Sequence, residues 1–187
     1  MNSVEKWVSI GAGAGLVGAG AWLLKHGITR TTDPRAALSG PRGVNVVESV
    51  TIGRSLEELY RFWRNLENLP QFMRHLASVE RLTDTLSRWR VKGPAGTTLE
   101  WDAEIYNDVP NKLVAWRSLE GSDVVSVGSV NFDRAAGRTR VTVSLQYNPP
   151  LGKIGDALAR LFGADAATEI REDLHRFKTM VESGTPA

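Results

Sequence analysis

The sequence predicts an α+β fold, in which a curved antiparallel sheet of about six or seven strands surrounds one long C-terminal helix. Three observations predict it. Apolar and polar residues alternate through most of residues 79–147, as in strands with one buried face. Helical periodicity is confined to a short stretch before this region and a long stretch after it. Since the apolar face of such a sheet must be covered, the long helix is expected to pack there.

The first elements precede the alternating region. Residues 44–52 (VNVVESVTI) are rich in β-branched residues and predict a strand. Ser55 then has the position of an N-cap before the amphipathic segment LEELYRFWRN, whose acidic first turn favours the helix dipole. Residues 66–73 predict a second short helix, interrupted by Pro70.

The alternating segments predict the strands of an antiparallel meander. They are residues 79–83, 86–92, 99–105, 112–119, 128–132 and 141–147. Pro149 and Pro150 end this region, and residues 151–182 predict one long helix with an apolar stripe.

Opposite charges are expected to face one another across the turn at 94–96. The expected cross-strand pairs are Arg88–Asp102, Arg90–Glu100 and Trp89–Trp101. The carboxylates of Asp102 and Glu104 could act as general acid–base groups. Their regular alternation with Trp101 and Ala103 instead favours a solvated outer face with salt bridges.

An uncharged, glycine-rich segment precedes the domain. Residues 7–24 (WVSIGAGAGLVGAGAWLL) would span about 27 Å as a helix, close to the roughly 30 Å hydrocarbon core of a bilayer. Trp7 and Trp22 stand at its ends, as at membrane interfaces. Residues 1–28 are therefore predicted to anchor the chain in the inner membrane. Because basic residues follow the segment, the main domain is expected to be cytoplasmic.

Three other interpretations of this segment compete with the membrane anchor. Gly13, Gly15 and Gly18 fit a dinucleotide-binding fingerprint, but no βαβ unit follows. Ala19–Ala21 fits a signal-peptide cleavage site, although Glu5 is unusual ahead of one. The third interpretation is a glycine-weakened helix without a membrane role.

Charge separates the N-terminal part from the rest of the chain. Residues 1–43 carry a net charge of +3 and residues 44–187 a net charge of −1. Residues 29–43, with two prolines and two glycines, predict a linker to a domain over 44–184. The nearly neutral domain argues against nucleic-acid binding, which needs clustered positive charge.

The composition excludes several kinds of chemistry. Cysteine is absent, which excludes disulfides, thiolate nucleophiles and cysteine-based metal sites. The three histidines, His26, His75 and His175, have no ligand-like spacing, so neither a metal nor a cofactor is expected. His75 is expected to be a surface or loop residue rather than a catalytic base, because no partner lies near it in sequence.

Tryptophans recur on the predicted apolar faces. Trp89, Trp101 and Trp116 lie on strands and Trp63 on the first helix. They could form the aromatic wall of a ligand cavity or simply fill the core, and the sequence leaves both alternatives open.

Eight blocks of the chain, in order, resemble a known superfamily. They are VESVTI, LEELYRFWRNLENLPQFM, VERL, SRWRVKGPAGTTLEWDAEI, LVAWRSLEG, GSVNF, TRVTVSLQYNPPLG and REDLHRFKTMVESG. Over about residues 44–184 the chain resembles bacterial proteins of the polyketide cyclase/dehydrase and coenzyme Q-binding START-like (SRPBCC) superfamily, including a membrane-associated branch. The resemblance implies the helix-grip fold, with a deep apolar cavity between the curved sheet and the C-terminal helix.

The resemblance implies binding of a hydrophobic small molecule such as a quinone, lipid or isoprenoid. Because no catalytic constellation is present, a non-enzymatic role is favoured. The alternatives are a cyclase or dehydratase acting on a polyketide-like substrate and an envelope interaction module with a filled cavity. An ionisable side chain inside the pocket (His75, Asp102 or Arg117) would favour the enzyme. The residues expected to line the cavity are Trp89, Trp101, Ala103, Ile105, Trp116, Val130, Phe132, Val143, Leu161 and Phe177.

Overall fold

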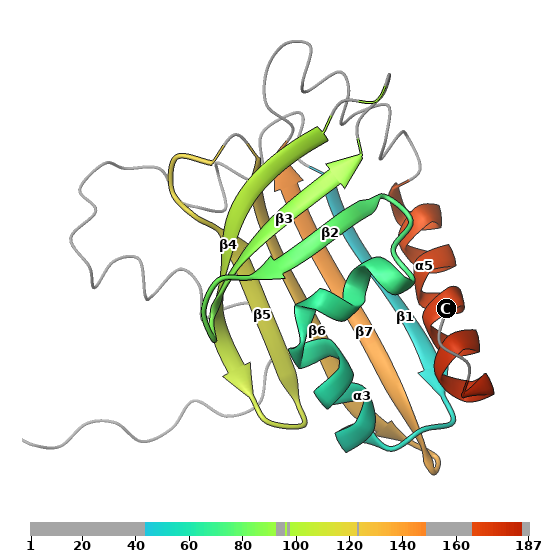
Figure 1. Cartoon of the computed structure of the whole chain (residues 1–187). Helices are drawn as coiled ribbons and strands as arrows, with labels where there is room; N and C mark the ends of the chain where they lie inside the picture. Colours follow the sequence, from blue (N-terminus) through green and yellow to red (C-terminus); the bar gives the residue numbers. More distant parts are fainter. Residues whose placement is uncertain (1–43, 93–95, 97, 123, 149–165, 185–187) are drawn as a thin grey trace, which may run out of the picture. The chain divides into compact units, whose positions relative to one another are not determined.

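The structure is a computed structural model that describes residues 44–92, 96, 98–122, 124–148 and 166–184. Figure 1 shows its elements in chain order. They are β1 (Val44–Ile52), α3 (Leu56–Arg64), the 3₁₀ helix η1 (Leu66–Gln71), β2 (Leu76–Arg81), β3 (Leu86–Lys92), β4 (Thr98–Val109), β5 (Leu113–Ser118), β6 (Val125–Ala135), β7 (Arg138–Asn148) and α5 (Ala166–Ser183).

The strands form one curled antiparallel sheet, as the sequence predicts. Its order is β1-β7-β6-β5-β4-β3-β2, so that β1 and β2 are the edges. In Figure 1, α5 runs beside β1, while η1 lies next to β2. Both edges therefore have a helix beside them, which limits pairing with other chains.

Polar contacts fix α5 along β1 and its following loop, from the second turn of the helix to its C-terminal end. Arg171 binds Glu48 at 2.7 Å, and Lys178 Nζ donates to the carbonyl of Thr51 at 3.0 Å. Further on, the Gly53 amide donates to Glu182 Oε1 at 2.7 Å. Glu169, Ile170 and Asp173, in the first turns of α5, border the pocket described below.

The start of α3 confirms the predicted cap. Ser55 Oγ accepts a hydrogen bond from the Glu58 amide at 3.1 Å, which satisfies one free N–H of the first turn. Leu59 and Trp63, one turn apart, are buried.

The predicted second helix is shorter and of another type. It is a 3₁₀ helix that ends at Gln71 instead of Met73. Pro70 explains the difference, because proline has no N–H to continue an α-helical ladder.

The register of β3 and β4 confirms the three predicted cross-strand pairs. Trp89 lies opposite Trp101, with Arg88 opposite Asp102 and Arg90 opposite Glu100. The prediction for the preceding strand was wrong at both ends. β2 begins at Leu76, includes a register shift between Leu76 and Ser78, and ends at Arg81. Thr83 lies in the following turn, where its Oγ1 accepts from the Leu86 amide at 3.0 Å.

The C-terminal helix has its predicted stripe wherever the structure describes it. Ile170, Leu174 and Phe177 are buried on one side of α5. Phe177 joins an aromatic cluster with Trp63 and Phe72, at ring-centroid distances of 5.7 and 4.9 Å respectively. The predicted first half of this helix, residues 151–165, lies outside the described residues.

No helix within the described ranges is long and apolar enough to cross a membrane. The segment predicted as an anchor, residues 7–24, lies outside those ranges, as does the predicted linker.

Candidate ligand pocket

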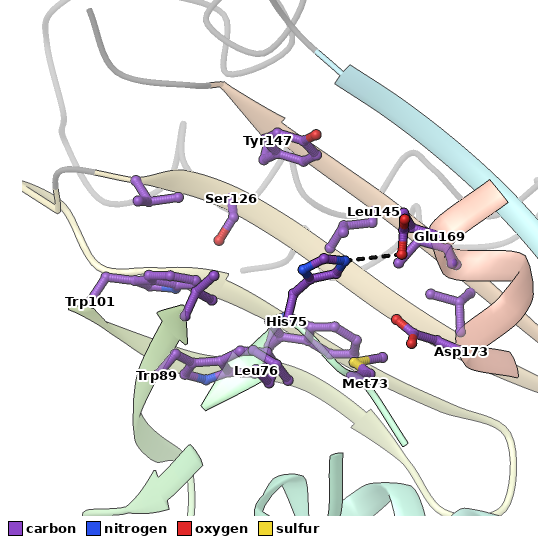
Figure 2. Close-up of a pocket in the computed structure, with 15 residues that line it drawn as sticks. Met73, His75, Leu76, Trp89, Trp101, Ser126, Leu145, Tyr147, Glu169 and Asp173 are labelled. Atoms are coloured by element: carbon purple, nitrogen blue, oxygen red, sulfur yellow. Dashed lines mark hydrogen bonds and ion pairs between the residues drawn. The ribbon is translucent and has the colours of Figure 1, made fainter. Parts of the chain in front are cut away.

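A pocket of about 80 Å³ lies between the sheet and the first turns of α5. Figure 2 shows side chains entering it from the turn before β2, from the strands and from α5. Its described lining is Met73, His75, Leu76, Trp89, Val91, Trp101, Trp116, Val124, Ser126, Val143, Leu145, Tyr147, Glu169, Ile170 and Asp173. Most of these side chains are apolar, with a few polar groups among them.

Three tryptophans from neighbouring strands form one wall of the pocket. Trp89 stacks on Trp101 at 6.1 Å and on Trp116 at 5.8 Å, in each case with 22° between the ring planes. Trp89 Nε1 donates to Ser87 Oγ at 2.9 Å. Its indole N–H is thus satisfied by its own strand, and the wall presents mainly hydrocarbon surface.

The most prominent polar contact of the pocket joins two distant parts of the chain. His75 Nε2 lies 3.0 Å from Glu169 Oε2, linking the turn before β2 to the first turn of α5. His75 does lie in a turn, as expected, but its side chain also lines the pocket and has a carboxylate partner. The local sequence could not reveal this partner, because Glu169 is 94 residues away from His75.

Asp173 is the most deeply buried charged group of the pocket, with its side chain 5% exposed. Its Oδ1 accepts from the Arg176 guanidinium and from the Arg74 amide at 3.4 Å. Burial raises the pKa of the Asp173 carboxyl, and the hydrogen bond and charge of Arg176 oppose that rise.

Tyr147 and Ser126 line the pocket away from α5. Burial raises the pKa of the Tyr147 phenol, so it is neutral at physiological pH. Figure 2 shows both residues on the β6 and β7 side, across from the tryptophan wall.

The residues predicted to line the cavity divide into three groups. Trp89, Trp101, Trp116 and Val143 line the pocket. Ala103, Ile105, Val130, Phe132 and Phe177 are buried in the core but are not among its described lining residues. Leu161 lies outside the described residues.

The sequence pattern contained a signal for some of the pocket-lining residues that were not predicted. Leu145 and Tyr147 share the alternation of Val143, and Ile170 belongs to the predicted helical stripe. The polar lining residues His75, Glu169 and Asp173 carried no such signal, since their convergence depends on how α5 packs.

The carboxylates considered as acid–base candidates lie elsewhere. Asp102 binds Arg88 at 2.8 Å, and Glu104 binds Arg117. None of these side chains lines the pocket, which agrees with the predicted salt-bridged outer face. Among the described residues, no group of three or more His, Asp or Glu is placed to hold a metal ion.

Comparison with known proteins identifies the family. Residues 52–175 match the family described as "Polyketide cyclase / dehydrase and lipid transport". An uncharacterized 17.2 kDa protein from the melC2-rnhH intergenic region of Streptomyces lincolnensis is 33% identical over 140 residues, covering 73% of this chain and 89% of that protein.

Solved structures agree with this family in fold. DR_A0006 from Deinococcus radiodurans, known from a crystal structure, is 41% identical in sequence and matches with a TM-score of 0.62. The match covers 75% of this chain and 98% of DR_A0006. A START superfamily protein from Mycobacterium smegmatis is 16% identical and matches with a TM-score of 0.59, over 75% of this chain and 99% of that protein. At this identity the match shows the fold alone. Family and fold together support a hydrophobic-ligand-binding or cyclase role. The chain therefore belongs to the polyketide cyclase/dehydrase and lipid transport family, and it has the helix-grip fold.

Proposed function

We propose that the protein binds a hydrophobic small molecule, such as a quinone, lipid or isoprenoid, in the pocket between the sheet and α5, without transforming it. The tryptophan wall is the observation that carries this proposal. Trp89, Trp101 and Trp116 offer a continuous apolar surface beside a cavity, and burying apolar surface yields about 25 cal/mol per Å² before the costs of association.

The size of the pocket constrains this proposal. Pockets for drug-sized ligands measure about 300–1,000 Å³, whereas this one measures about 80 Å³. Binding of a larger ligand would therefore require the walls of the pocket to move apart. The described contacts that fix α5 to β1 and its following loop begin at Arg171 and continue toward the C-terminus. The turns that border the pocket are held as well, by the contact of Glu169 with His75 and by the hydrogen bond from the Arg74 amide to Asp173, so a larger ligand would have to displace these contacts.

The test is native mass spectrometry of the purified full chain, with organic extraction of any bound molecule. Thermal shifts with decylubiquinone and with oleic acid supply a second measurement. We expect a co-purified ligand, or a stabilising shift with one of these two probes. Protein that never carries a ligand and whose melting temperature neither probe raises would contradict the proposal. That result would favour a cavity filled by core side chains, an alternative that the small pocket volume supports.

A matched pair of variants connects the shift to the pocket. Leu145→Trp places a large ring in the pocket from β7, whereas Val47→Trp adds the same ring at an exposed position of β1. We expect the first to abolish the shift and the second to leave it unchanged. Equal shifts in both variants would indicate binding elsewhere.

A second candidate function is acid–base catalysis, as in a cyclase or dehydratase of a polyketide-like substrate. The observation that favours it is the His75–Glu169 pair at 3.0 Å beside the pocket, an arrangement able to accept and return a proton. Proton exchange at the α-carbon of 2-tetralone in deuterated water, followed by NMR, tests it. Catalysis predicts faster exchange with wild type than with His75→Gln, and equal rates would exclude His75 as the base.

We also propose that residues 7–24 tether the domain to the cytoplasmic face of the inner membrane. The support is the uncharged run bounded by Trp7 and Trp22, followed by basic residues. Cell fractionation of the full chain against a variant lacking residues 7–24 tests this. The proposal predicts a shift from the membrane to the supernatant upon deletion.

A further inference from the structure

Asp173 stands out because it is the more deeply buried of the two carboxylates, Glu169 and Asp173, that line the largely apolar pocket. It lies on α5 one turn after Glu169, and its side chain is 5% exposed. Figure 2 shows its carboxylate pointing from the helix toward His75 and the pocket. Burying a carboxylate costs several kcal/mol unless it is paired and hydrogen-bonded, so its partners determine what it can do.

The described partners of Asp173 satisfy one of its two oxygens. Oδ1 accepts from the Arg176 guanidinium and from the Arg74 amide. No described residue donates a hydrogen bond to Oδ2. Arg176 is itself held in place, because its Nε donates to the carbonyl of Phe72 at 3.0 Å and its Nη1 lies 3.4 Å from Glu172.

The protein thus orients the carboxylate through Oδ1, while Oδ2 has no donor among the described residues. Ionised carboxylates only accept hydrogen bonds, and a bond from a neutral donor to a charged group is stronger than one between neutral groups. A ligand hydroxyl is the complementary group. A hydrocarbon skeleton on the same ligand would rest against the tryptophan wall.

We propose that Asp173 is the polar anchor of the pocket, and that its Oδ2 accepts a hydrogen bond from the hydroxyl of an alcohol or phenol whose apolar part lies along Trp89, Trp101 and Trp116. This inference rests on the proposed binding function and specifies the chemical class of the ligand. Burial raises the pKa of Asp173, and a donated hydroxyl would favour its ionised form.

The experiment compares three probes that differ only in one substituent: naphthalene, 1-naphthol and 1-methoxynaphthalene. Their affinities for the full-length chain are measured by isothermal titration calorimetry. We expect 1-naphthol to bind about tenfold more tightly than the other two, since only it can donate to a charged acceptor. Because this comparison uses wild-type protein, it tests the proposal even if a variant fails to fold.

The variant is Asp173→Asn, which keeps an acceptor for Arg176 and Arg74 and can place an NH₂ group at the position of Oδ2. We expect its preference for 1-naphthol to fall to within about twofold. Glu172→Gln is the matched control, because Glu172 also contacts Arg176 but is 56% exposed and is not among the pocket's described lining residues. It should keep the full preference.

The outcomes separate the two proposals. Equal binding of all three probes by the wild type, or an undiminished preference in Asp173→Asn, overturns the anchor and leaves hydrophobic binding intact. If the wild type binds none of the probes, the proposed function loses its support together with the anchor.

Discussion

The indole of Trp116 lies directly against the backbone of Gly128 on the neighbouring strand. The two residues are paired across β5 and β6. A Cβ atom at position 128 would lie 2.5 Å from Trp116 Cε2 and 2.8 Å from its Nε1, well inside van der Waals contact. Glycine at this position therefore gives the ring its place in the pocket wall, and the reason is space, not backbone conformation.

Gly128→Ala should consequently destabilise the protein. The added methyl group forces Trp116 or the strand to shift, and overpacking of this kind costs about 1–3 kcal/mol. Urea unfolding measures the change. Ser129→Ala, at the next position of β6 on the opposite face of the sheet, is the control and should change little.

A double-mutant cycle with Trp116→Leu locates the cause. If the clash with the indole is responsible, Gly128→Ala should cost less in the Trp116→Leu background than in the wild type. Additive effects of the two substitutions would contradict this explanation.

The sequence predicted the sheet better than the pocket. Trp89 and Trp101 belong to strands joined by a short turn, so local alternation determines both their register and their shared face. Leu145 and Tyr147 lie two and four residues after Val143 on the same strand, so the same alternation places all three on one face of the sheet. The alternation of apolar and polar residues within each strand was therefore enough to predict the apolar side of the pocket.

The polar side of the pocket could not be predicted in this way. His75 and Glu169 lie 94 residues apart and meet only because α5 packs next to the turn before β2. Helical periodicity assigned Ile170 and Leu174 to the buried stripe but offered no reason for Asp173 to be buried between them. Burial of a charge depends on a specific partner, here Arg176, which a hydrophobic pattern does not record.

Loss of the predicted helix cap should be measurable by itself. Ser55→Ala removes the hydrogen bond to the Glu58 amide and should lower the free energy of unfolding by about 1 kcal/mol. Ser55→Asp supplies an equivalent acceptor and should retain most of the stability. Equal losses in both variants, measured by urea unfolding, would show that the hydroxyl contributes by another route.

The outer face should contribute stability that disappears in acid. The hydrogen bond and charge of Arg88 lower the pKa of Asp102 from its ordinary value of 3.8. This contribution is fully present above pH 3.8 and is lost as the pH falls through the lower folded-state value. Asp102→Asn should therefore reduce the melting temperature at pH 6, with a smaller difference from wild type near pH 3.

Arg88→Gln provides the corresponding control for Asp102. Without the guanidinium, the effect of Asp102→Asn on the melting temperature should depend much less on pH. Added salt should also reduce the effect, because both side chains are partly exposed. A pH dependence that persists in the Arg88→Gln background would assign it to another carboxylate.

Asp173 should show the opposite dependence on pH. Burial raises its pKa above the ordinary 3.8, so the ionised carboxyl costs the folded state stability at neutral pH. As the pH falls through the raised value toward 3.8, the folded state takes up a proton and this cost is relieved. Relative to Asp173→Asn, the wild type should thus gain stability between pH 7 and pH 4 in urea unfolding.

Glu172→Gln is the comparison for this pH dependence, because it removes a neighbouring carboxylate that also contacts Arg176 but retains Asp173. It should therefore gain stability toward pH 4 as the wild type does. If Glu172→Gln instead loses the gain to the same extent as Asp173→Asn, the assignment to Asp173 is contradicted. A loss confined to Asp173→Asn would mean that the pocket holds this carboxylate at a cost in stability, as expected of a group kept for its ligand and not for the fold.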